Sequence, residues 1–240
     1  RPLPPDIFSV CFEHNPNKGK RKEMGIVLKR RDNAPIVKDV YGGLIDILMN
    51  AHDIPAAIQF VKTYLQDIVD EKFPLEKLII TKKLNSFYKN PESIAHKVLA
   101  ERMGKRDPGN KPSVGSRVPF VYIQTKGKVK LQGNKIENPE YIRANNLKPD
   151  YGFYITNQLM KPIQQVFALI LEDIPSFKRK VPAFKRKCEY LKQTCKDDEK
   201  YNKKEEALRN KEVKKIIFDD ALRQANNIKN GQKSIKKFFG

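Results

Sequence analysis

The sequence has 240 residues, no tryptophan and only three cysteines, Cys11, Cys188 and Cys195. No CxxC pair is present, and Cys188 and Cys195 have no second pair or histidine nearby, so we expect neither a disulfide framework nor a zinc site. No apolar run reaches the ~18 residues needed to cross a bilayer, and no signal-peptide pattern opens the chain. We therefore expect an intracellular protein with no membrane partner and no cofactor of its own.

Acidic residues are scarce relative to basic ones. The chain carries 48 Lys and Arg against 28 Asp and Glu, which gives a formal net charge of +20 and a pI near 9.8. Such an excess favours a polyanionic partner, with nucleic acid as the leading candidate and an anionic membrane surface as the weaker one. The length suits one large domain or two small ones.

Hydrophobic periodicity indicates mostly helices with a few short strands. We expect helices over residues 35–50, from the N-cap Asp53 to about residue 71, over 94–103 with Gly104 as C-cap, over 139–145, and over 151–170 with a break at Pro162. Strands are expected at 7–12 and 24–28, paired as a hairpin across residues 15–22, then at 78–81, at 118–123 and in a second hairpin through 128–131. Beyond residue 177 we expect helical fragments and, notably over 196–210, solvated charge.

A cationic loop lies between the expected helix that ends near Gly104 and the strand at residues 118–123. It is rich in Gly and Pro, and such small residues let backbone amides and basic side chains approach a phosphate backbone closely. Its basic residues are Lys105, Arg106, Lys111 and Arg117.

This region closely resembles the thumb of family B DNA polymerases, the replicative delta-like group and its relatives in large DNA viruses. The matching residues are LAERM at 99–103, KRDPG at 105–109, PS at 112–113, Gly115 and RVPFV at 117–121. Residues 24–35, MGIVLKRRDNAP, resemble the final palm segment of the same polymerases.

The resemblance implies an α+β fold: a mainly helical polymerase thumb with short strands and hairpins, preceded by the end of the palm sheet. The implied regions are the end of the palm at 1–34, the thumb at 35–176, a basic, helical and partly flexible region at 177–231, and a tail at 232–240. The DNA-binding residues implied by the match are Arg30, Arg31, Arg102, Lys105, Arg106, Lys111 and Arg117.

Several of these positions also have a purely structural explanation. On charge alone, Arg30 and Arg31 suit solvated charges or partners of Asp32 and Asp39 equally well. The resemblance favours a place at the palm–thumb junction near the primer duplex. Lys82 and Lys83 fit a DNA-facing pair and a solvated pair about equally. We expect the aromatic residues of 151–170 to be core, because the helix period explains them without stacked bases.

The end of the chain matches Q-x-x-aliphatic-x-x-aromatic-aromatic, the sliding-clamp-binding box. A single 3₁₀ turn would bring its three apolar side chains to one side, and two adjacent phenylalanines are unfavourable in water without a partner. The alternative is that these rings fold back onto the domain. The box residues are Gln232, Ile235, Phe238 and Phe239.

The metal-binding aspartates of such polymerases, one of them in a YxDTDS-type motif, have no match in this sequence. We therefore expect the C-terminal part of a replicative polymerase, inactive alone, whose partners are primer-template DNA, the sliding clamp and the catalytic remainder, which would hold Mg²⁺. Two alternatives stay open: a non-catalytic DNA-binding or processivity protein built on a thumb, and a basic RNA-binding protein. A location in the nucleus or at a viral replication site in the cytoplasm would fit.

Overall fold

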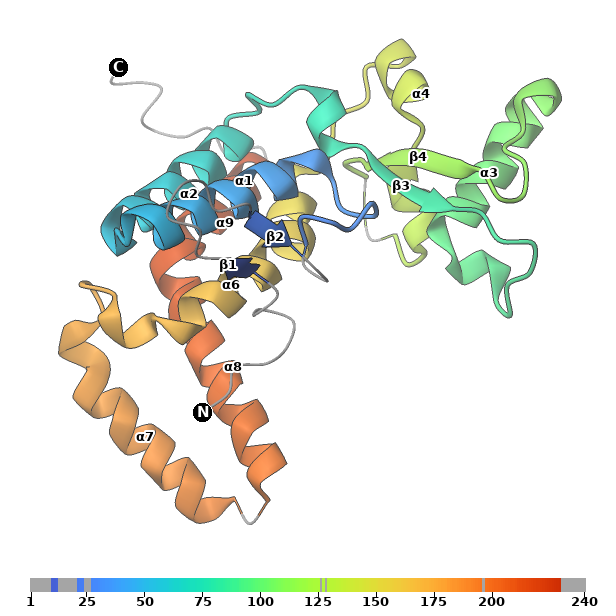
Figure 1. Cartoon of the computed structure of the whole chain (residues 1–240). Coiled ribbons are helices and arrows are strands. Elements are labelled where there is room, and N and C mark those ends of the chain that lie inside the picture. Colours follow the sequence, from blue (N-terminus) through green and yellow to red (C-terminus); the bar gives the residue numbers. More distant parts are fainter. Residues whose placement is uncertain are drawn as a thin grey trace. The chain divides into compact units, whose positions relative to one another are not determined.

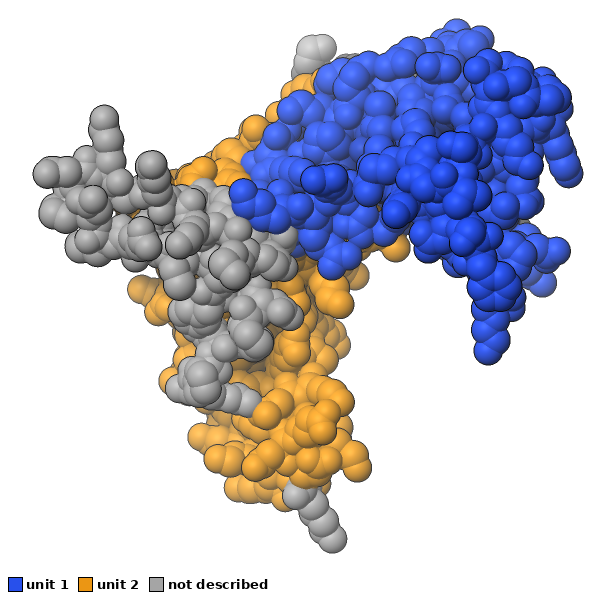
Figure 2. Space-filling view, turned by 45° about the vertical axis from the view of Figure 1, so that its right-hand side comes forward, with its two compact units in different colours: residues 1–39, 73–154 blue, residues 40–72, 155–240 orange. Residues whose placement is uncertain are grey.

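A computed structural model describes residues 10–12, 21–23, 27–125, 127, 129–195 and 197–229. The chain divides into two compact units, which Figure 2 colours separately. Unit 1 comprises residues 1–39 and 73–154, and unit 2 comprises residues 40–72 and 155–240, so each unit is built from two separate segments. This division does not test the palm, thumb, basic and tail regions expected from the sequence, which stay predictions.

Unit 1 contains a three-stranded antiparallel sheet in the order β3-β4-β5 (Figure 1). The strands are β3 (Ile80–Lys83), β4 (Arg117–Tyr122) and β5 (Ile136–Glu137). The β-branched and aromatic run at 118–123 was predicted as a buried strand, and β4 confirms it, with Val118, Phe120 and Val121 buried. The strand predicted at 78–81 begins two residues later, because Leu78 completes the 3₁₀ turn Leu75–Leu78.

Helix α3 (Ala95–Arg106) packs against β5, and the short α4 (Pro139–Ala144) packs against β4. The prediction that Gly104 caps α3 is wrong, because the helix continues to Arg106 and Asp107 is its C-cap. Gly104 has a packing role instead. A Cβ at this position would lie 2.7 Å from Cδ of Lys111, so the glycine lets the following loop lie against the helix.

The hairpin predicted through residues 128–131 is also wrong. The described residues of 124–135 form no strand, and the chain pairs with β4 only at β5, where Tyr122 lies opposite Ile136. A Cβ at Gly133 would lie 2.7 Å from Cβ of Val98 on α3, so the segment before β5 packs closely against this helix. The glycine thus serves close helix packing rather than a hairpin turn.

The first hairpin is confirmed in a shifted form. β1 (Val10–Phe12) pairs antiparallel with β2 (Arg21–Glu23), with Val10 opposite Glu23. The described second strand is Arg21–Glu23, and residues 27–28 form a turn rather than a strand. Residues 24–26 of the expected strand lie outside the described residues.

Unit 2 is helical. The boundary between the units falls within α1 (Pro35–Asp46), and a π-helical turn (Ile47–Ala51) follows it. Gly43 lies close to the ring of Phe60, so a larger residue at this position would clash with that ring. α2 (Ile54–Val69) begins at the predicted N-cap, where Asp53 accepts a 2.8 Å hydrogen bond from the Ala56 N–H. The remaining helices are α6 (Met160–Leu169), α7 (Val181–Thr194), α8 (Asp198–Ile217) and α9 (Asp219–Lys229).

The stretch expected as solvated charge, residues 196–210, lies largely within α8. Asp197 caps this helix by accepting from the Glu199 N–H, and ion pairs join Lys203 to Glu199 and Arg209 to Glu205 one turn apart. Capping and pairs at this spacing favour a helix even where apolar residues are sparse. The predicted interruption of the 151–170 run occurs before Pro162, as a π-helical segment (Tyr154–Leu159) between α5 (Tyr151–Phe153) and α6.

Tyr154 connects the 3₁₀ turn before β3 to strand β4 through its buried hydroxyl. The hydroxyl donates to the Leu78 carbonyl at 2.7 Å and accepts from the Tyr122 N–H at 3.1 Å. Burial raises the pKa of this phenol well above its usual value. The predicted core role of this aromatic residue is confirmed, since its side chain is fully buried.

Replacing Tyr154 with phenylalanine should lower the free energy of unfolding by about 1–3 kcal/mol, because two backbone groups lose their hydrogen-bond partner. Urea titration of both proteins measures the difference. Tyr141→Phe is the matched control and should change stability by less than about 0.5 kcal/mol, since its ring stays beneath Arg106. An equal loss in the two variants would contradict a special role for the Tyr154 hydroxyl.

Candidate nucleic-acid interface

One cluster of basic residues lies where residues 30–32 meet the start of β4 and the middle of β3. Arg117 reaches across this point: its Nε donates to Thr81 Oγ1 at 3.1 Å, and its Nη2 donates to the Thr81 carbonyl at 2.8 Å and the Arg31 carbonyl at 3.3 Å. Thr81 adds a hydrogen bond from its hydroxyl to the Arg31 carbonyl. We call this cluster the arginine junction: Arg30, Arg31, Asp32, Thr81, Lys82, Lys83 and Arg117.

Asp32 is the carboxylate of the arginine junction. Arg30 donates to both of its oxygens, at 3.0 and 2.9 Å, and Lys82 donates to one of them at 2.7 Å. The paired hydrogen bonds from Arg30, with a further one from Lys82, hold the pKa of Asp32 well below its usual value against the opposing effect of partial burial. Two cations of the junction are therefore committed to this carboxylate.

The junction still carries an excess of positive charge. Among the described residues, Asp32 is the one carboxylate that forms an ion pair with its five Arg and Lys side chains. Lys83 lies directly opposite Arg117 in the β3–β4 register, and like charges in this position destabilise a sheet. A phosphate bound here would remove that repulsion.

Two further predicted contacts, Arg102 and Arg106, lie on α3 and share one buried carboxylate. Glu137 on β5 is 3% exposed, and its Oε2 lies 3.0 Å from Arg106 Nη2 and 3.6 Å from Arg102 Nε. Arg102 also donates from Nη2 to the carbonyls of Gly133 and Ile136, at 2.8 and 2.7 Å. These contacts fasten α3 to the edge of the sheet.

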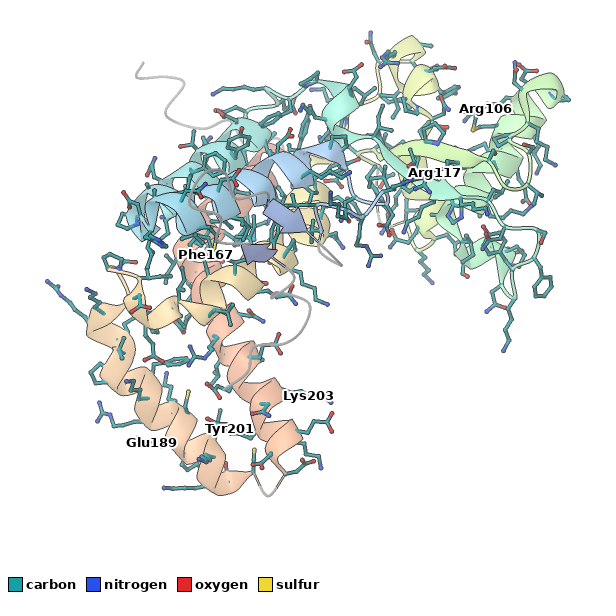
Figure 3. The ribbon with its side chains drawn as sticks, viewed as in Figure 1. Arg106, Arg117, Phe167, Glu189, Tyr201 and Lys203 are labelled. Carbon is teal, nitrogen blue, oxygen red and sulfur yellow. The ribbon has the colours of Figure 1, made fainter. Side chains whose placement is uncertain are left out.

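Arg106 is held on a second side by an aromatic ring. Its guanidinium carbon lies 3.6 Å from the centre of the Tyr141 ring on α4, a cation–π contact. Figure 3 labels Arg106 beside α3 and Arg117 on the sheet of the same unit. Both hydrogen bonds of Arg102 go from its Nη2 to backbone carbonyls, and Arg106 keeps about a third of its side-chain surface exposed.

The loop at residues 107–116 folds back on α3 and carries Lys111, while Lys105 lies in the last turn of the helix. Asp107 shapes its start by accepting from the Gly109 N–H at 3.1 Å, and Gly115, with φ of +88°, allows its final turn. The Gly115 N–H donates to the Leu84 carbonyl at 2.7 Å, which ties the loop to the end of β3. Lys105 and Lys111 are exposed, and neither forms an ion pair within the described part of the chain.

The predicted DNA contacts thus fall into three groups. Arg30, Arg31 and Arg117 meet in the arginine junction, and Arg102 and Arg106 surround Glu137. Lys105 lies at the end of α3, and Lys111 lies in the loop that follows. The sequence did not single out Glu137 or Tyr141, because their partners are 31 to 35 residues away in the chain. Lys82 pairs with Asp32, whereas Lys83 is exposed. The clamp box at 232–239 lies outside the described residues.

Within the described ranges, no three His, Cys, Asp or Glu side chains gather as metal ligands, and no helix is long and apolar enough to cross a membrane.

Comparison with known proteins identifies the family. Residues 8–170 match the model of DNA polymerase family B. The DNA polymerase of Pyramimonas orientalis virus is 50% identical over 230 residues, covering 95% of this chain and 19% of that protein. The DNA polymerase delta catalytic subunit of Candida albicans is 37% identical over 152 residues, covering 63% of this chain and 14% of that protein. A solved family B polymerase structure from Pyrobaculum calidifontis is 22% identical with a TM-score of 0.48, covering 61% of this chain and 18% of that chain.

The family model spans more than half of the chain, so this chain belongs to DNA polymerase family B. The predicted resemblance to family B, with viral and delta-type relatives, is confirmed. The chain spans about a fifth or less of the length of these relatives, all of which are named DNA polymerases. The thumb and the clamp box stay predictions.

Replacing Asp32 with asparagine should lower the free energy of unfolding at pH 7 by about 1–2 kcal/mol, because the hydrogen-bonded pairs with Arg30 and Lys82 are lost. The folded protein depresses the pKa of Asp32, so the carboxylate contributes stability above its unfolded pKa of about 3.9 and loses that contribution as pH falls below it. The difference between the two proteins should therefore shrink between pH 5 and pH 2.

Urea unfolding at pH 7, 5 and 3 measures this dependence. Glu101→Gln removes an exposed i,i+4 pair with Lys97 and serves as the control, with an expected change below about 0.5 kcal/mol. A constant difference between wild type and Asp32→Asn across that pH range would contradict the assignment.

Proposed function

We propose that this chain is the palm exit, thumb and clamp-binding tail of a replicative DNA-directed DNA polymerase, and that it grips the primer-template duplex through its phosphates. One observation carries the proposal beyond the family match. Several exposed basic side chains of unit 1 form no ion pair with a carboxylate among the described residues. These side chains are Arg31, Lys83, Lys105 and Lys111.

The basic residues divide into a frame and a gripping set. Arg102 acts as a positioning residue, since its guanidinium is committed to two carbonyls and Glu137, and Arg30 is likewise committed to Asp32. Arg106 pairs with Glu137, and Arg117 donates to Thr81 and the Arg31 carbonyl. Part of each side chain remains exposed and can contact a phosphate. The gripping set is therefore Lys105 and Lys111 first, then Arg31 and Lys83.

Contacts to phosphate and sugar fix the position of a protein on a duplex without reading its sequence. A polymerase must hold every sequence it copies, so a grip of this kind fits replication. Each neutralised phosphate releases condensed counterions, so the affinity should fall steeply as salt rises.

The chemistry belongs to the remainder of the polymerase. Nucleotidyl transfer by a two-metal mechanism requires carboxylates that this chain does not gather within its described residues. The chain alone should therefore bind duplex and not extend a primer. We place its action inside the cell, in the nucleus or at a viral replication site in the cytoplasm.

The tail would tether the polymerase to the sliding clamp. In this proposal Ile235, Phe238 and Phe239 enter an apolar pocket on the clamp, and Gln232 forms a hydrogen bond beside it. A second linked site raises the local concentration of the polymerase on DNA, so processivity rises without a tighter grip at the first site.

Lys105→Gln combined with Lys111→Gln should weaken binding to a recessed primer-template about tenfold near 100 mM salt. The slope of log affinity against log salt should fall by about 2, because two phosphate contacts contribute about 0.9 each. Fluorescence anisotropy across a salt series measures both quantities.

The matched control replaces Lys77 and Lys97, which lie in the same unit and pair with Asp39 and Glu101. It removes the same charge and should change the affinity less than about twofold, since paired surface lysines contribute little. Equal losses in both double variants would mean that net charge, rather than the loop, governs binding.

Phe238→Ala combined with Phe239→Ala should weaken binding to a purified sliding clamp at least about 100-fold, because buried aromatic anchors commonly contribute 2 kcal/mol or more each. Surface plasmon resonance with immobilised clamp measures the loss. Ser234→Ala, at a variable position of the box, should bind like wild type. Unchanged clamp binding by the double variant, with unchanged affinity for duplex, would reject the tail as the tether.

A further inference from the structure

A short direct repeat lies in unit 2, beyond the part of the chain that matches the polymerase family model. Phe-Lys-Arg-Lys occurs at residues 177–180 and again, seven positions later, at residues 184–187. The family match ends at residue 170, so the family does not assign this segment a role. We call residues 177–187 the basic repeat.

The two phenylalanines of the basic repeat are anchors. Phe177 is 1% exposed and Phe184 is 5% exposed, and their rings pack edge to face with centres 5.5 Å apart. The guanidinium of Arg209 on α8 lies 5.5 Å from the Phe184 ring on another side. Each Lys-Arg-Lys triplet therefore follows directly from a fixed, buried side chain.

The two triplets form a surface of one charge. The first occupies the 3₁₀ turn Lys178–Lys180, the second lies in the first half of α7, and all six side chains are exposed. Among the described residues, Lys185 is the one member with an ion pair, 3.3 Å from Glu172. The members without an ion pair in that part of the chain are Lys178, Arg179, Lys180, Arg186 and Lys187.

In the neighbouring helix α8, by contrast, several basic residues form ion pairs with acidic residues of the same helix. Its basic residues alternate with acidic ones, and Lys203, Arg209 and Lys215 pair with glutamates three or four positions away. Figure 1 shows α7 and α8 as neighbours within unit 2, so two adjacent helices differ in charge pattern. The basic repeat is thus not a consequence of overall composition alone.

The position of the basic repeat in α7 is unfavourable unless an anion is near. The N-terminal end of a helix carries partial positive charge, and cations in the first turns are repelled by it. The first turn of α7 has no acidic residue to compensate. A bound phosphate group would relieve both the helix end and the mutual repulsion of the triplets.

We propose that the basic repeat is a second contact for double-stranded DNA, which binds the phosphate backbone independently of the lysines in unit 1. The inference deepens the proposed function, because duplex DNA is taken as the partner in both. Basic clusters of this density are typical of nucleic-acid-binding surfaces.

The burial of the anchors favours a duplex over a single strand or a groove that binds an extended peptide. A protein groove that reads a basic segment as an extended peptide would need Phe177 and Phe184 withdrawn from the core. Binding of single strands relies on exposed aromatic rings that stack on bases, and both rings of the repeat are buried. Tyr190, 66% exposed one turn after Arg186, is the single ring nearby on α7 that such binding would use.

The test uses the full chain with glutamine at Lys178, Arg179, Lys180, Arg186 and Lys187. Lys185 is left unchanged because it pairs with Glu172. The control places glutamine at five exposed lysines of α8, so both proteins lose the same charge from the same unit; these are Lys200, Lys203, Lys211, Lys214 and Lys215. Circular dichroism first establishes that both variants keep the wild-type helix content.

Anisotropy with a blunt duplex across a salt series should show that the repeat variant binds at least tenfold more weakly near 100 mM salt. Its salt slope should fall by about 3 or more, because each lost phosphate contact lowers the slope by about 0.9. The α8 control should keep most of both values. Combining the repeat variant with Lys105→Gln and Lys111→Gln should lower the slope by the sum of the separate losses.

Three outcomes would overturn the proposal. The repeat variant and the α8 control could lose duplex affinity equally. The wild-type repeat could prefer single-stranded DNA, with the preference lost in Tyr190→Ala. Anionic vesicles or structured RNA could show a larger loss in the repeat variant than duplex does. In each case the variant with Lys105→Gln and Lys111→Gln still tests the proposed function, because it alters unit 1 and leaves the basic repeat intact.

Discussion

The buried carboxylate of Glu137 is the interaction on which the rest of unit 1 depends. A charge that is 3% exposed is stable only when partners replace its lost hydration, and Arg102, Arg106 and the Asn138 N–H provide them. Because both arginines lie on α3, satisfying Glu137 also fixes that helix on the sheet. The loop at residues 107–116 leaves the end of the same helix, so the directions of Lys105 and Lys111 follow from this buried charge.

Arginine and lysine have different tasks in this protein, although both contribute to the net charge. Arg102 and Arg117 each donate to two backbone carbonyls, and Arg209 contacts Glu172, Glu205 and the Ala168 carbonyl. A planar guanidinium offers several donors in fixed directions, which suits a brace between segments distant in sequence. Lys105 and Lys111 end in compact, hydrated charges on flexible stems, which suits contacts at the surface.

The sequence predicted those features that depend on neighbouring residues. The Asp53 cap, β4 and the family all followed from local patterns or from fixed motif spacing. Features set by contacts between distant residues were missed or misplaced. The sequence around Gly104 predicts a helix end, but in the fold this glycine makes room for the side chain of Lys111. The sequence around Gly133 predicts a turn, but in the fold this glycine packs against Val98. For the site, the basic positions were predictable, but the sequence could not tell braces from exposed charges, because Glu137 and the Arg31 carbonyl become partners only in the fold.

Under the proposed function, in which the protein moves along DNA, a frame of arginines with lysines at its surface would have a mechanical consequence. Bidentate guanidinium contacts hold a phosphate in a defined geometry, whereas an ammonium group on a flexible stem can pass from one phosphate to the next with little change in energy. Since counterions return as each contact breaks, the free energy of such a step stays small at every sequence. A thumb that engages duplex mainly through Lys105 and Lys111, while Arg102 stays within the protein, would hold the helix firmly and still let it advance by one base pair.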